Sequence, residues 1–150
     1  MAYDYYIGID PGKSGGIAIM DSSGIVEIFK TPLSPIDFFH KFEPYADKSI
    51  YCITEKVHSM PQNGGKANYT FGYINGVLHT ILMVCQIPFD LRTPQMWMKY
   101  YALKKGKSES NTQWKNRLKV KAQQLFPKEK VTLWNADALL IANYCREEYR

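Results

Sequence analysis

The feature that most constrains the fold is a set of three short β-forming runs within the first thirty residues. They are YYIGID at 5–10, IAIM at 17–20 and IVEIF at 25–29. The segments between them, PGKSGG and DSSG, are rich in turn-forming residues, and apolar runs bounded in this way are typical of strands. The second connection is short enough for a hairpin. We therefore expect the chain to begin as an antiparallel set of three strands.

After this set, helix and strand patterns alternate. An amphipathic helix is expected from Ser34 to Pro44, followed by a fourth apolar strand, IYCIT, at 50–54. The polar, glycine-containing segment at 55–68 is expected to be a functional loop. A long apolar-rich helix over 69–86 and a fifth strand at 87–91 complete the alternation.

The last third of the sequence predicts helices. One follows Thr93, a basic one ends before Pro127, and Asn135 caps the last. An antiparallel start followed by alternating helices and strands predicts an α/β fold, a five-stranded mixed sheet flanked by helices. With no linker long enough to divide it, the chain is expected to form a single domain over 1–150.

Basic residues concentrate between Lys99 and Lys130. This segment holds ten lysines or arginines and two glutamates, a local net charge of +8, whereas the rest of the chain has nine basic and twelve acidic residues, a net charge of −3. Such a segment attracts polyanions, of which nucleic acid is the first candidate. A solvated helix face that only keeps the protein soluble is the alternative.

Apolar and cysteine patterns indicate the compartment. No apolar run is long enough to span a membrane, and the first residues do not resemble a signal peptide. Three widely spaced cysteines in apolar stretches, Cys52, Cys85 and Cys145, favour buried free thiols in a reducing environment over a zinc site. We expect a cytoplasmic protein with no membrane partner.

Three acidic residues stand where predicted strands or helices begin or end. Asp10 and Glu55 each follow an apolar strand, and Asp137 lies in the first turn of the last helix. Because ligands bind at the carboxyl ends of strands in α/β sheets, these acids are candidates for one shared site. Carboxylate oxygens suit Mg²⁺, which serves phosphodiester hydrolysis. Each acid alone has a simpler interpretation, as a turn starter, a loop-flanking residue or a partner of the helix dipole.

The GKS triplet in PGKSGG does not form a nucleotide-binding phosphate loop. The glycine that this motif requires five residues before its GKS glycine is replaced by Ile7. The residues after GKS predict a strand, whereas a phosphate loop leads into a helix. We therefore exclude an ATPase of this class.

Six segments of the sequence together resemble a known family. In chain order they are IGIDPGKSGGIAI, TEKVHSMPQNG, TFGYINGVL, IPFDLRTPQMWMK, KAQQLFP and ADALLIANY. They resemble the RuvC-like Holliday junction resolvases of phages and bacteria, in the RNase H-like superfamily, and most closely the phage type. The resemblance implies an RNase H-like fold, a homodimer, dependence on Mg²⁺ or Mn²⁺ with two ions in each active site, and paired symmetric nicks across a four-way junction.

The resemblance also assigns site residues. It identifies Asp10, Glu55 and Asp137 as metal ligands and catalytic residues, and Lys115 as a catalytic lysine, with Lys119 and Lys121 as alternatives for that role. The family usually has a fourth acid three or four residues before the last one, where this chain has Leu133 and Trp134. Either Asn135 replaces that ligand or three acids suffice.

Substrate and partner contacts are expected on two surfaces. Residues expected to contact branched DNA are Lys13, Lys56, His58, Met60, Lys66, Tyr69, Phe71, Lys104, Lys105, Lys107, Arg117, Lys119 and Lys121. In the family the helix after the fourth strand packs against the second protomer, which assigns Gly72, Tyr73, Gly76 and Val77 to the dimer interface. Branch-migration or recombination proteins are candidate partners, and a phage-infected bacterium is a candidate setting.

Two other functions are compatible with the sequence. The missing fourth acid suits a catalytically weak module that binds branched DNA, for which binding is indifferent to metal. A YqgF-like RNA-processing nuclease begins with a similar first motif, although the basic helix and the EKVHSMP segment argue against it.

Overall fold

The computed structural model describes residues 2–32, 34–58 and 60–150, and position 59 of the predicted loop lies outside the described residues. Five strands, five α-helices and a short 3₁₀ helix occur in this part of the chain. In order they are β1 (Tyr5–Ile9), β2 (Gly16–Met20), β3 (Ile25–Lys30), α1 (Pro35–Phe42), η1 (Glu43–Tyr45), β4 (Ile50–Glu55), α2 (Gly65–Val84), β5 (Phe89–Arg92), α3 (Pro94–Tyr100), α4 (Asn111–Leu125) and α5 (Ala136–Tyr149).

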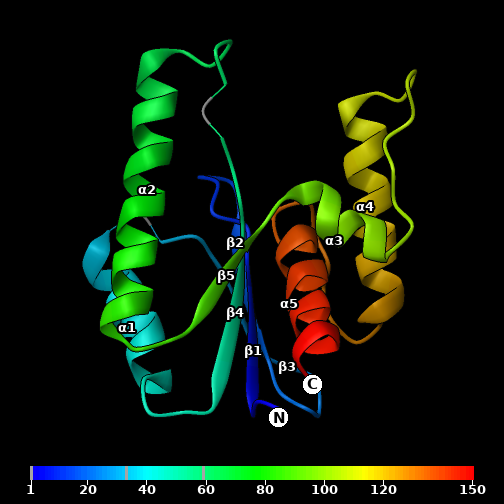
Figure 1. Cartoon of the computed structure of the whole chain (residues 1–150). Helices are drawn as coiled ribbons and strands as arrows, with labels where there is room; N and C mark the ends of the chain where they lie inside the picture. Colours follow the sequence, from blue (N-terminus) through cyan, green and yellow to red (C-terminus); the bar gives the residue numbers. More distant parts are fainter. Residues whose placement is uncertain (1, 33, 59) are drawn as a thin grey trace.

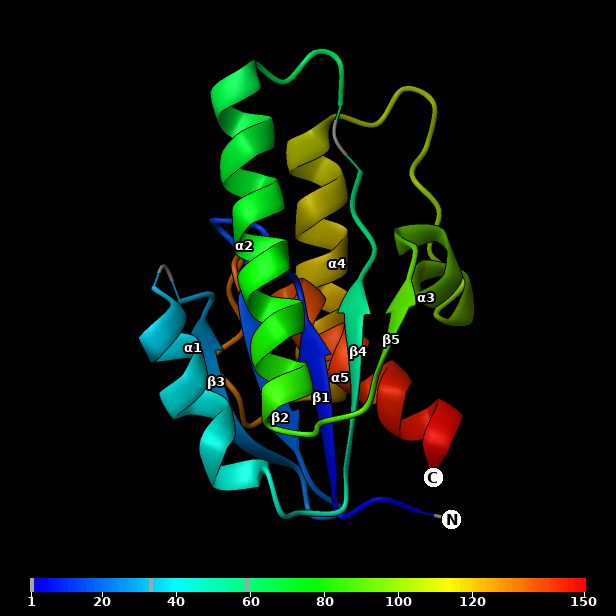
Figure 2. The same ribbon diagram turned by 60° about the vertical axis from the view of Figure 1, so that its left-hand side comes forward.

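The strands form one mixed sheet in the order β3-β2-β1-β4-β5. The first three are antiparallel, as their short connections predict, whereas β1 with β4 and β4 with β5 are parallel. Figure 2 shows β1 in the middle of this sheet, between β2 and β4. The predicted α/β class and five-stranded mixed sheet are therefore confirmed.

Helices cover both faces of the sheet, so its central strand is buried on both sides. α1 and α2 lie on one face, and α3, α4 and α5 on the other (Figure 1). Neighbouring residues of β1 point to opposite faces: Ile7 packs with Leu78 of α2 in one core, and Tyr6 packs with Leu139 of α5 in the other. Because helices cover both of its faces, β1 is almost entirely apolar.

Helix α5 packs unusually close to β1, and Gly8 permits this contact. A Cβ atom at position 8 would lie 2.1 Å from the backbone nitrogen of Ala142 and 2.4 Å from the carbonyl oxygen of Ala138. Only glycine fits at this position, because the obstructing atoms belong to the helix backbone. The first turn of α5, with Asp137, is thereby fixed relative to the end of β1.

Two predicted boundaries were wrong by a few residues. α2 begins at Gly65 instead of residue 69, because the side-chain amide of Asn68 donates to the carbonyl oxygens of Met60 and Asn63 and ties the loop to the first turn. β5 begins at Phe89 instead of 87, because the backbone first reverses after α2 through Gln86, which has a φ of 56°.

Two further sequence expectations concern cysteines and membranes. Cys52, Cys85 and Cys145 are free and buried, as predicted. No helix in the described part of the chain combines the length and apolar character needed to cross a bilayer.

Candidate active site

A tight turn after β1 places Asp10 at the carboxyl end of that strand. The Asp10 amide donates to the carbonyl oxygen of Gly16 at 2.9 Å, and the Gly12 amide donates to Asp10 Oδ1 at 3.3 Å. A Cβ atom at Gly15 would lie 2.2 Å from the Asp10 carbonyl oxygen, so glycine is required there. Thr31 donates its hydroxyl to that same carbonyl oxygen. The turn therefore holds the Asp10 backbone from several sides.

Glu55 is the last residue of β4 and lies beside Asp10 at the same edge of the sheet. β1 and β4 pair in parallel with Ile9 opposite Thr54, so the next residues of the two strands are neighbours. Trp97 of α3, which is fully buried, donates its indole N–H to Glu55 Oε2 at 2.9 Å. This hydrogen bond fixes one oxygen of the carboxylate.

Asp137 reaches the same edge from α5, and Lys115 reaches it from α4. The Asp137 side chain is 6% exposed, and its Oδ2 lies 2.5 Å from the Lys115 ammonium nitrogen. Its other oxygen, Oδ1, is buried and accepts no hydrogen bond from any residue that the structure describes. Such an unsatisfied anionic oxygen is costly unless a cation or donor approaches it.

Electrostatic coupling shows that the four side chains form one cluster. Burial, followed by the charge of Asp137, raises the pKa of Asp10 to about 6. Burial, followed by the charge of Asp10, raises the pKa of Glu55 to about 7. Partial burial lowers the pKa of Lys115, but the charge of Asp137 and its hydrogen bond outweigh this, and the pKa is raised overall. One ammonium group does not balance three carboxylates, so the cluster lacks positive charge.

The donor set of this cluster fits a hard divalent cation. All its anionic groups are carboxylates, the ligands that Mg²⁺ prefers, and the buried Asp137 Oδ1 has no hydrogen-bond partner among the described residues. Within the described residues, no three Asp, Glu, His or Cys side chains are arranged to hold a metal ion. In this conformation Lys115 supplies the positive charge next to Asp137.

The structure does not support Asn135 as a replacement fourth ligand. Its Oδ1 accepts from the Thr132 amide at 2.7 Å, and its Nδ2 donates to the Lys130 carbonyl oxygen at 3.1 Å. The side chain is 3% exposed and shapes the segment before α5. The prediction that it caps α5 was half right, since Asn135 is the N-cap residue but makes no side-chain capping bond.

The positions of the family's fourth acid have another use in this chain. Leu133 is 51% exposed. The ring of Trp134 lies 3.0 Å from where a Cβ atom of Gly16 would be, and the Lys30 ammonium nitrogen is 5.8 Å from the ring centroid. At the two positions where the resemblance implies a fourth acid, this chain therefore has an exposed leucine and a tryptophan that lies against Gly16.

The predicted DNA-contacting residues fall into two groups, one around the start of α2 and one on or before α4. Figure 1 shows that the first turns of α2 and of α4 both extend past the sheet on the same side. The residues near α2 and its preceding loop are Lys13, Lys56, His58, Met60, Lys66, Tyr69 and Phe71; those on or before α4 are Lys104, Lys105, Lys107, Arg117, Lys119 and Lys121.

Some of these side chains are already engaged within the protein. Arg117 donates to both carboxylate oxygens of Glu109, at 2.9 and 3.0 Å, so binding a phosphate would compete with this pair. Lys105 donates to Asn111 at 2.6 Å, and Lys121 lies over the Tyr101 ring. The contact of Arg117 with DNA stays a prediction, and it requires Arg117 to exchange Glu109 for a phosphate.

Sequence reasoning missed Trp97 as part of the site. Its segment, TPQMW, was recognised as a motif, but an indole that donates to a carboxylate 42 positions away depends on the tertiary fold. The only available signal was a tryptophan in a short helix that follows a strand.

Comparison with known proteins extends this picture. No protein-family profile and no curated protein matches the chain. Among solved structures, it is similar to T. thermophilus RuvC in complex with a Holliday junction substrate, with a TM-score of 0.61 and 17% identity, covering 92% of this chain and 90% of that one. A second Thermus thermophilus RuvC structure gives a TM-score of 0.58 and 15% identity, covering 97% of both chains.

The chain has the RuvC fold. The expected RNase H-like architecture is thereby confirmed. At these identities the likeness concerns the fold, and the function rests on the site itself.

Proposed function

We propose that this protein is a divalent-metal-dependent endonuclease that cuts branched DNA, and that it resolves four-way junctions by paired symmetric nicks. The observation that carries this proposal is the cluster of Asp10, Glu55, Asp137 and Lys115, contributed by four separate segments at one edge of the sheet. The RuvC fold supports it, because one of the similar structures is a complex with a Holliday junction.

In this proposal Asp10, Glu55 and Asp137 hold Mg²⁺ or Mn²⁺, with two ions expected. When bound, such cations activate an attacking water and neutralise charge on the leaving oxygen. Trp97 keeps Glu55 in place by its hydrogen bond, as residues behind a metal ligand commonly do.

Lys115 is assigned a role in stabilising the reacting phosphate. Its side chain is half-exposed, so its ammonium group can turn from Asp137 toward a bound DNA strand. A lysine beside the scissile phosphate stabilises the negative charge that develops on the phosphate oxygens.

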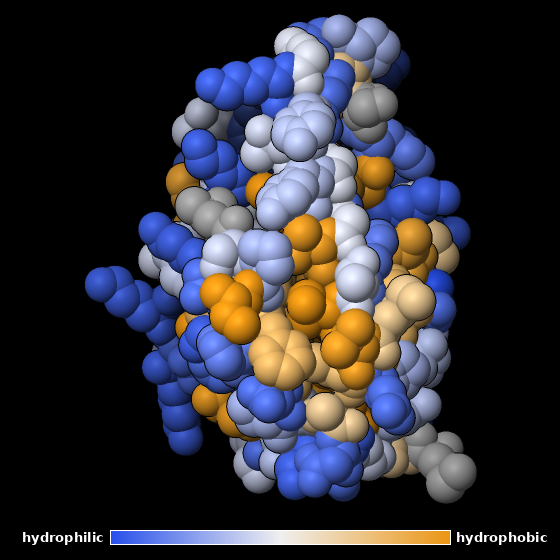
Figure 3. Space-filling view, turned by 90° about the vertical axis from the view of Figure 1, so that its left-hand side faces the viewer, coloured by the Kyte–Doolittle hydropathy of each residue, from blue (hydrophilic) through white to orange (hydrophobic). Residues whose placement is uncertain are grey.

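We further propose that two protomers associate through the exposed face of α2. Figure 3 shows apolar side chains gathered on the face of the molecule that α1 and α2 form. A groove there is lined by Pro35, Tyr73, Gly76, Val77, Thr80 and Ile81. The exposed apolar residues Ile36, Met83 and Val84 extend this surface. A two-fold symmetric dimer matches the symmetry of a four-way junction.

The alternative is a module that binds branched DNA without cutting it. The Lys115–Asp137 pair favours that alternative, as does the finding that no three potential ligands among the described residues are arranged to hold a metal ion in this conformation. It predicts junction binding that does not change with metal and no nicking.

The deciding experiment compares cutting and binding on the same substrate. A labelled four-way junction is incubated with wild-type protein, Asp10→Asn and the surface control Asp47→Asn, with Mg²⁺ for cutting and with EDTA for binding. We expect paired nicks from wild type and Asp47→Asn, and binding without nicks from Asp10→Asn. Metal-independent binding by wild type without nicks would establish the binding module instead, and the absence of junction binding would overturn both readings.

A further inference from the structure

A tryptophan and a lysine meet at one edge of the sheet, and the site described above does not use them. Trp134 lies in the segment before α5, and Lys30 is the last residue of β3. The Lys30 ammonium nitrogen is 5.8 Å from the centroid of the Trp134 ring, within the range of a cation–π contact. Because the two residues are far apart in the sequence, only the fold brings them together.

Strand register places Lys30 in line with Asp10. In the antiparallel pairing of β1 with β2, Ile9 lies opposite Ile17. The next pair is therefore Asp10 and Gly16, and the Asp10 amide donates to the Gly16 carbonyl oxygen at 2.9 Å. Gly16 in turn lies opposite Lys30 of β3. The three residues form one row across three strands, and Lys30 is two strand spacings, about 10 Å, from Asp10.

The Trp134 ring lies in this row, beside Asp10. Ala18 packs in the core on the α5 side, and Gly16, two residues earlier in β2, faces the same way. Gly8 of β1 also faces α5, so Asp10, two residues later, does too. The Trp134 ring is 3.0 Å from where a Cβ atom of Gly16 would be. Directly opposed side chains on one face are about 5 Å apart, so the ring adjoins the Asp10 side chain.

Both side chains are accessible to a ligand. Trp134 is only partly buried, and Lys30 is exposed. Among the residues that the structure describes, no carboxylate pairs with Lys30. Leu133, which is 51% exposed, precedes the ring in the chain. An aromatic face followed by a cation suits one repeat of a DNA backbone, a deoxyribose followed by a phosphate.

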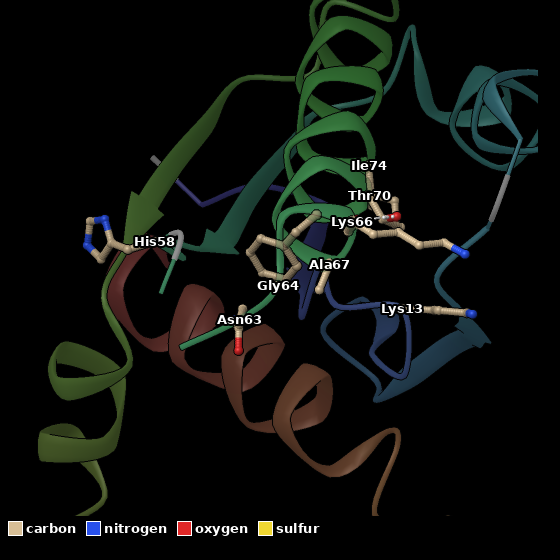
Figure 4. Close-up of a pocket in the computed structure, with 9 residues that line it drawn as sticks. Lys13, His58, Asn63, Gly64, Lys66, Ala67, Thr70 and Ile74 are labelled. Atoms are coloured by element: carbon tan, nitrogen blue, oxygen red, sulfur yellow. Dashed lines mark hydrogen bonds between the residues drawn. The ribbon is translucent and has the colours of Figure 1, made fainter. Parts of the chain in front are cut away.

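This surface is separate from a cavity of about 590 Å³ on the other face of the sheet. The cavity is lined by residues of the turn after β1, the loop after β4 and α2, among them Lys13, Lys66 and Ile74 (Figure 4). Ile74 belongs to the core between the sheet and α2. Trp134 and Lys30 do not line this cavity. The DNA contacts expected at the loop and α2 therefore leave both residues free for another part of the substrate.

We propose that Trp134 and Lys30 bind the backbone of the cut strand next to the scissile phosphate. The ring packs against the deoxyribose of the flanking nucleotide, and the ammonium group binds the following phosphate. These contacts determine which phosphate of the strand lies at Asp10. The inference rests on the proposed function, and it gives a position where the resemblance implies a fourth acid a role in placing the substrate.

The test removes the charge of one phosphate at a time. Four-way junctions carry a neutral methylphosphonate at single linkages on either side of the cut, and binding is measured in EDTA so that it does not depend on cutting. We expect wild-type protein to bind one of these junctions roughly two- to fivefold more weakly than unmodified DNA, the effect of one exposed ion pair.

Lysine variants connect that phosphate to the protein. Lys30→Ala should bind the unmodified junction more weakly by the same factor, with a salt dependence lowered by about one phosphate contact. It should no longer respond to the sensitive linkage. Lys30→Arg keeps the charge and should keep the response. Lys48→Ala, which changes a lysine before β4 and so at the opposite end of that strand, should behave as wild type.

Trp134 is tested by the accuracy of cutting. Trp134→Ala removes the surface for the sugar, so we expect weaker junction binding and, in Mg²⁺, nicks that spread to neighbouring linkages. Trp134→Phe keeps an aromatic ring and should keep both the affinity and the cut position. Tyr100→Ala changes an exposed aromatic residue of α3 and is the control. Circular dichroism shows whether each variant is folded, and the Lys30 variants supply the readout if Trp134→Ala is not.

Failure of this inference is distinguishable from failure of the proposed function. Junction cutting by wild type, with Lys30→Ala as sensitive as wild type to every methylphosphonate, overturns the backbone contact and leaves the nuclease standing. Unchanged affinity and an unchanged cut position in folded Trp134→Ala overturn the role of the ring. Absence of junction binding by wild type overturns the proposed function and this inference together.

Discussion

Helices α5 and α2 pack on opposite faces of the same sheet but are buried to very different degrees. In α5, nine of fourteen residues are buried, whereas in α2 only Ile74, Leu78 and Leu82 of twenty are. α5 carries Asp137 into the carboxylate cluster, and α2 carries a cavity wall and an exposed apolar face. The comparison indicates that packing within the chain positions Asp137, whereas α2 leaves most of its surface free to contact other molecules.

The largest effect is expected from Gly8→Val, which tests how tightly α5 packs against β1. The new side chain would meet the backbone of α5, so the helix would have to move away from β1. We expect the free energy of unfolding to fall by more than about 3 kcal/mol, at or beyond the usual range for overpacked cores. Chemical denaturation measures this. The free energy of unfolding of Gly8→Ala should lie between those of Gly8→Val and wild type. An unchanged denaturation midpoint for Gly8→Val would show that α5 does not pack tightly against β1.

The second prediction concerns the charge deficit of the cluster. Asp10 and Glu55 have folded-state pKa values of about 6 and about 7, above their ordinary values of 3.8 and 4.5. The folded state therefore binds more protons than the unfolded state between about pH 4 and pH 7, and its stability falls as the pH rises through this window. Asp10→Asn removes one of these charges and should stabilise the metal-free protein at pH 7 by about 2–3 kcal/mol.

Denaturation in EDTA at several pH values checks this prediction. Wild type should lose stability from pH 4 to pH 7, and Asp10→Asn should lose less. Asp47→Asn, whose side chain is 80% exposed, should follow wild type. A wild-type stability that rises with pH over this range would contradict the assigned burial of Asp10 and Glu55.

The five strands could be predicted from the sequence, because apolar runs and turn residues are local signals. The approach of Asp10 to Glu55 could be expected because both acids follow apolar strands of an α/β sheet, and the parallel pairing of β1 with β4 accounts for it. The start of α2 could not be predicted, because it depends on an amide that reaches back to the loop instead of a capping residue. The pairing of Arg117 with Glu109 was also missed, because composition shows a basic segment but not which of its charges are neutralised.

Trp97→Phe tests how far the site depends on a buried neighbour. The variant keeps the aromatic packing of α3 but removes the donor to Glu55. We expect nicking activity and Mn²⁺ affinity each to fall about 10–100-fold, as for other groups that hold a metal ligand. Quenching of the remaining tryptophan fluorescence measures Mn²⁺ binding independently of activity.

Trp114→Phe is the matched control for this prediction. Trp114 is also buried, in the core on the same face of the sheet, and its indole makes no hydrogen bond to the described residues of the site. It should change stability without changing Mn²⁺ affinity. Equal effects of the two variants on metal binding would show that Trp97 acts through packing alone.

The smallest change in stability is expected at Gly76, on the exposed face of α2. A Cβ atom there would have no neighbour within 4 Å, so Gly76→Ala should stabilise the isolated protomer by roughly 0.5–1 kcal/mol through its higher helix propensity. If α2 forms the dimer seam, that same methyl group stands where the second protomer approaches. Denaturation at low protein concentration should therefore show the gain, while sedimentation shows weaker self-association.

Gly24→Ala is the control that separates the effect of free space around a new methyl group from the effect of backbone conformation on stability. Gly24 also has no neighbour near a would-be Cβ, but its φ of 145° is rarely adopted by other residues, so this variant should lose stability where Gly76→Ala gains it. A gain in protomer stability at Gly76 with unchanged self-association would place the dimer contact elsewhere. In that case the exposed apolar face of α2 would not bind a second protomer, and its difference in burial from α5 would need another explanation.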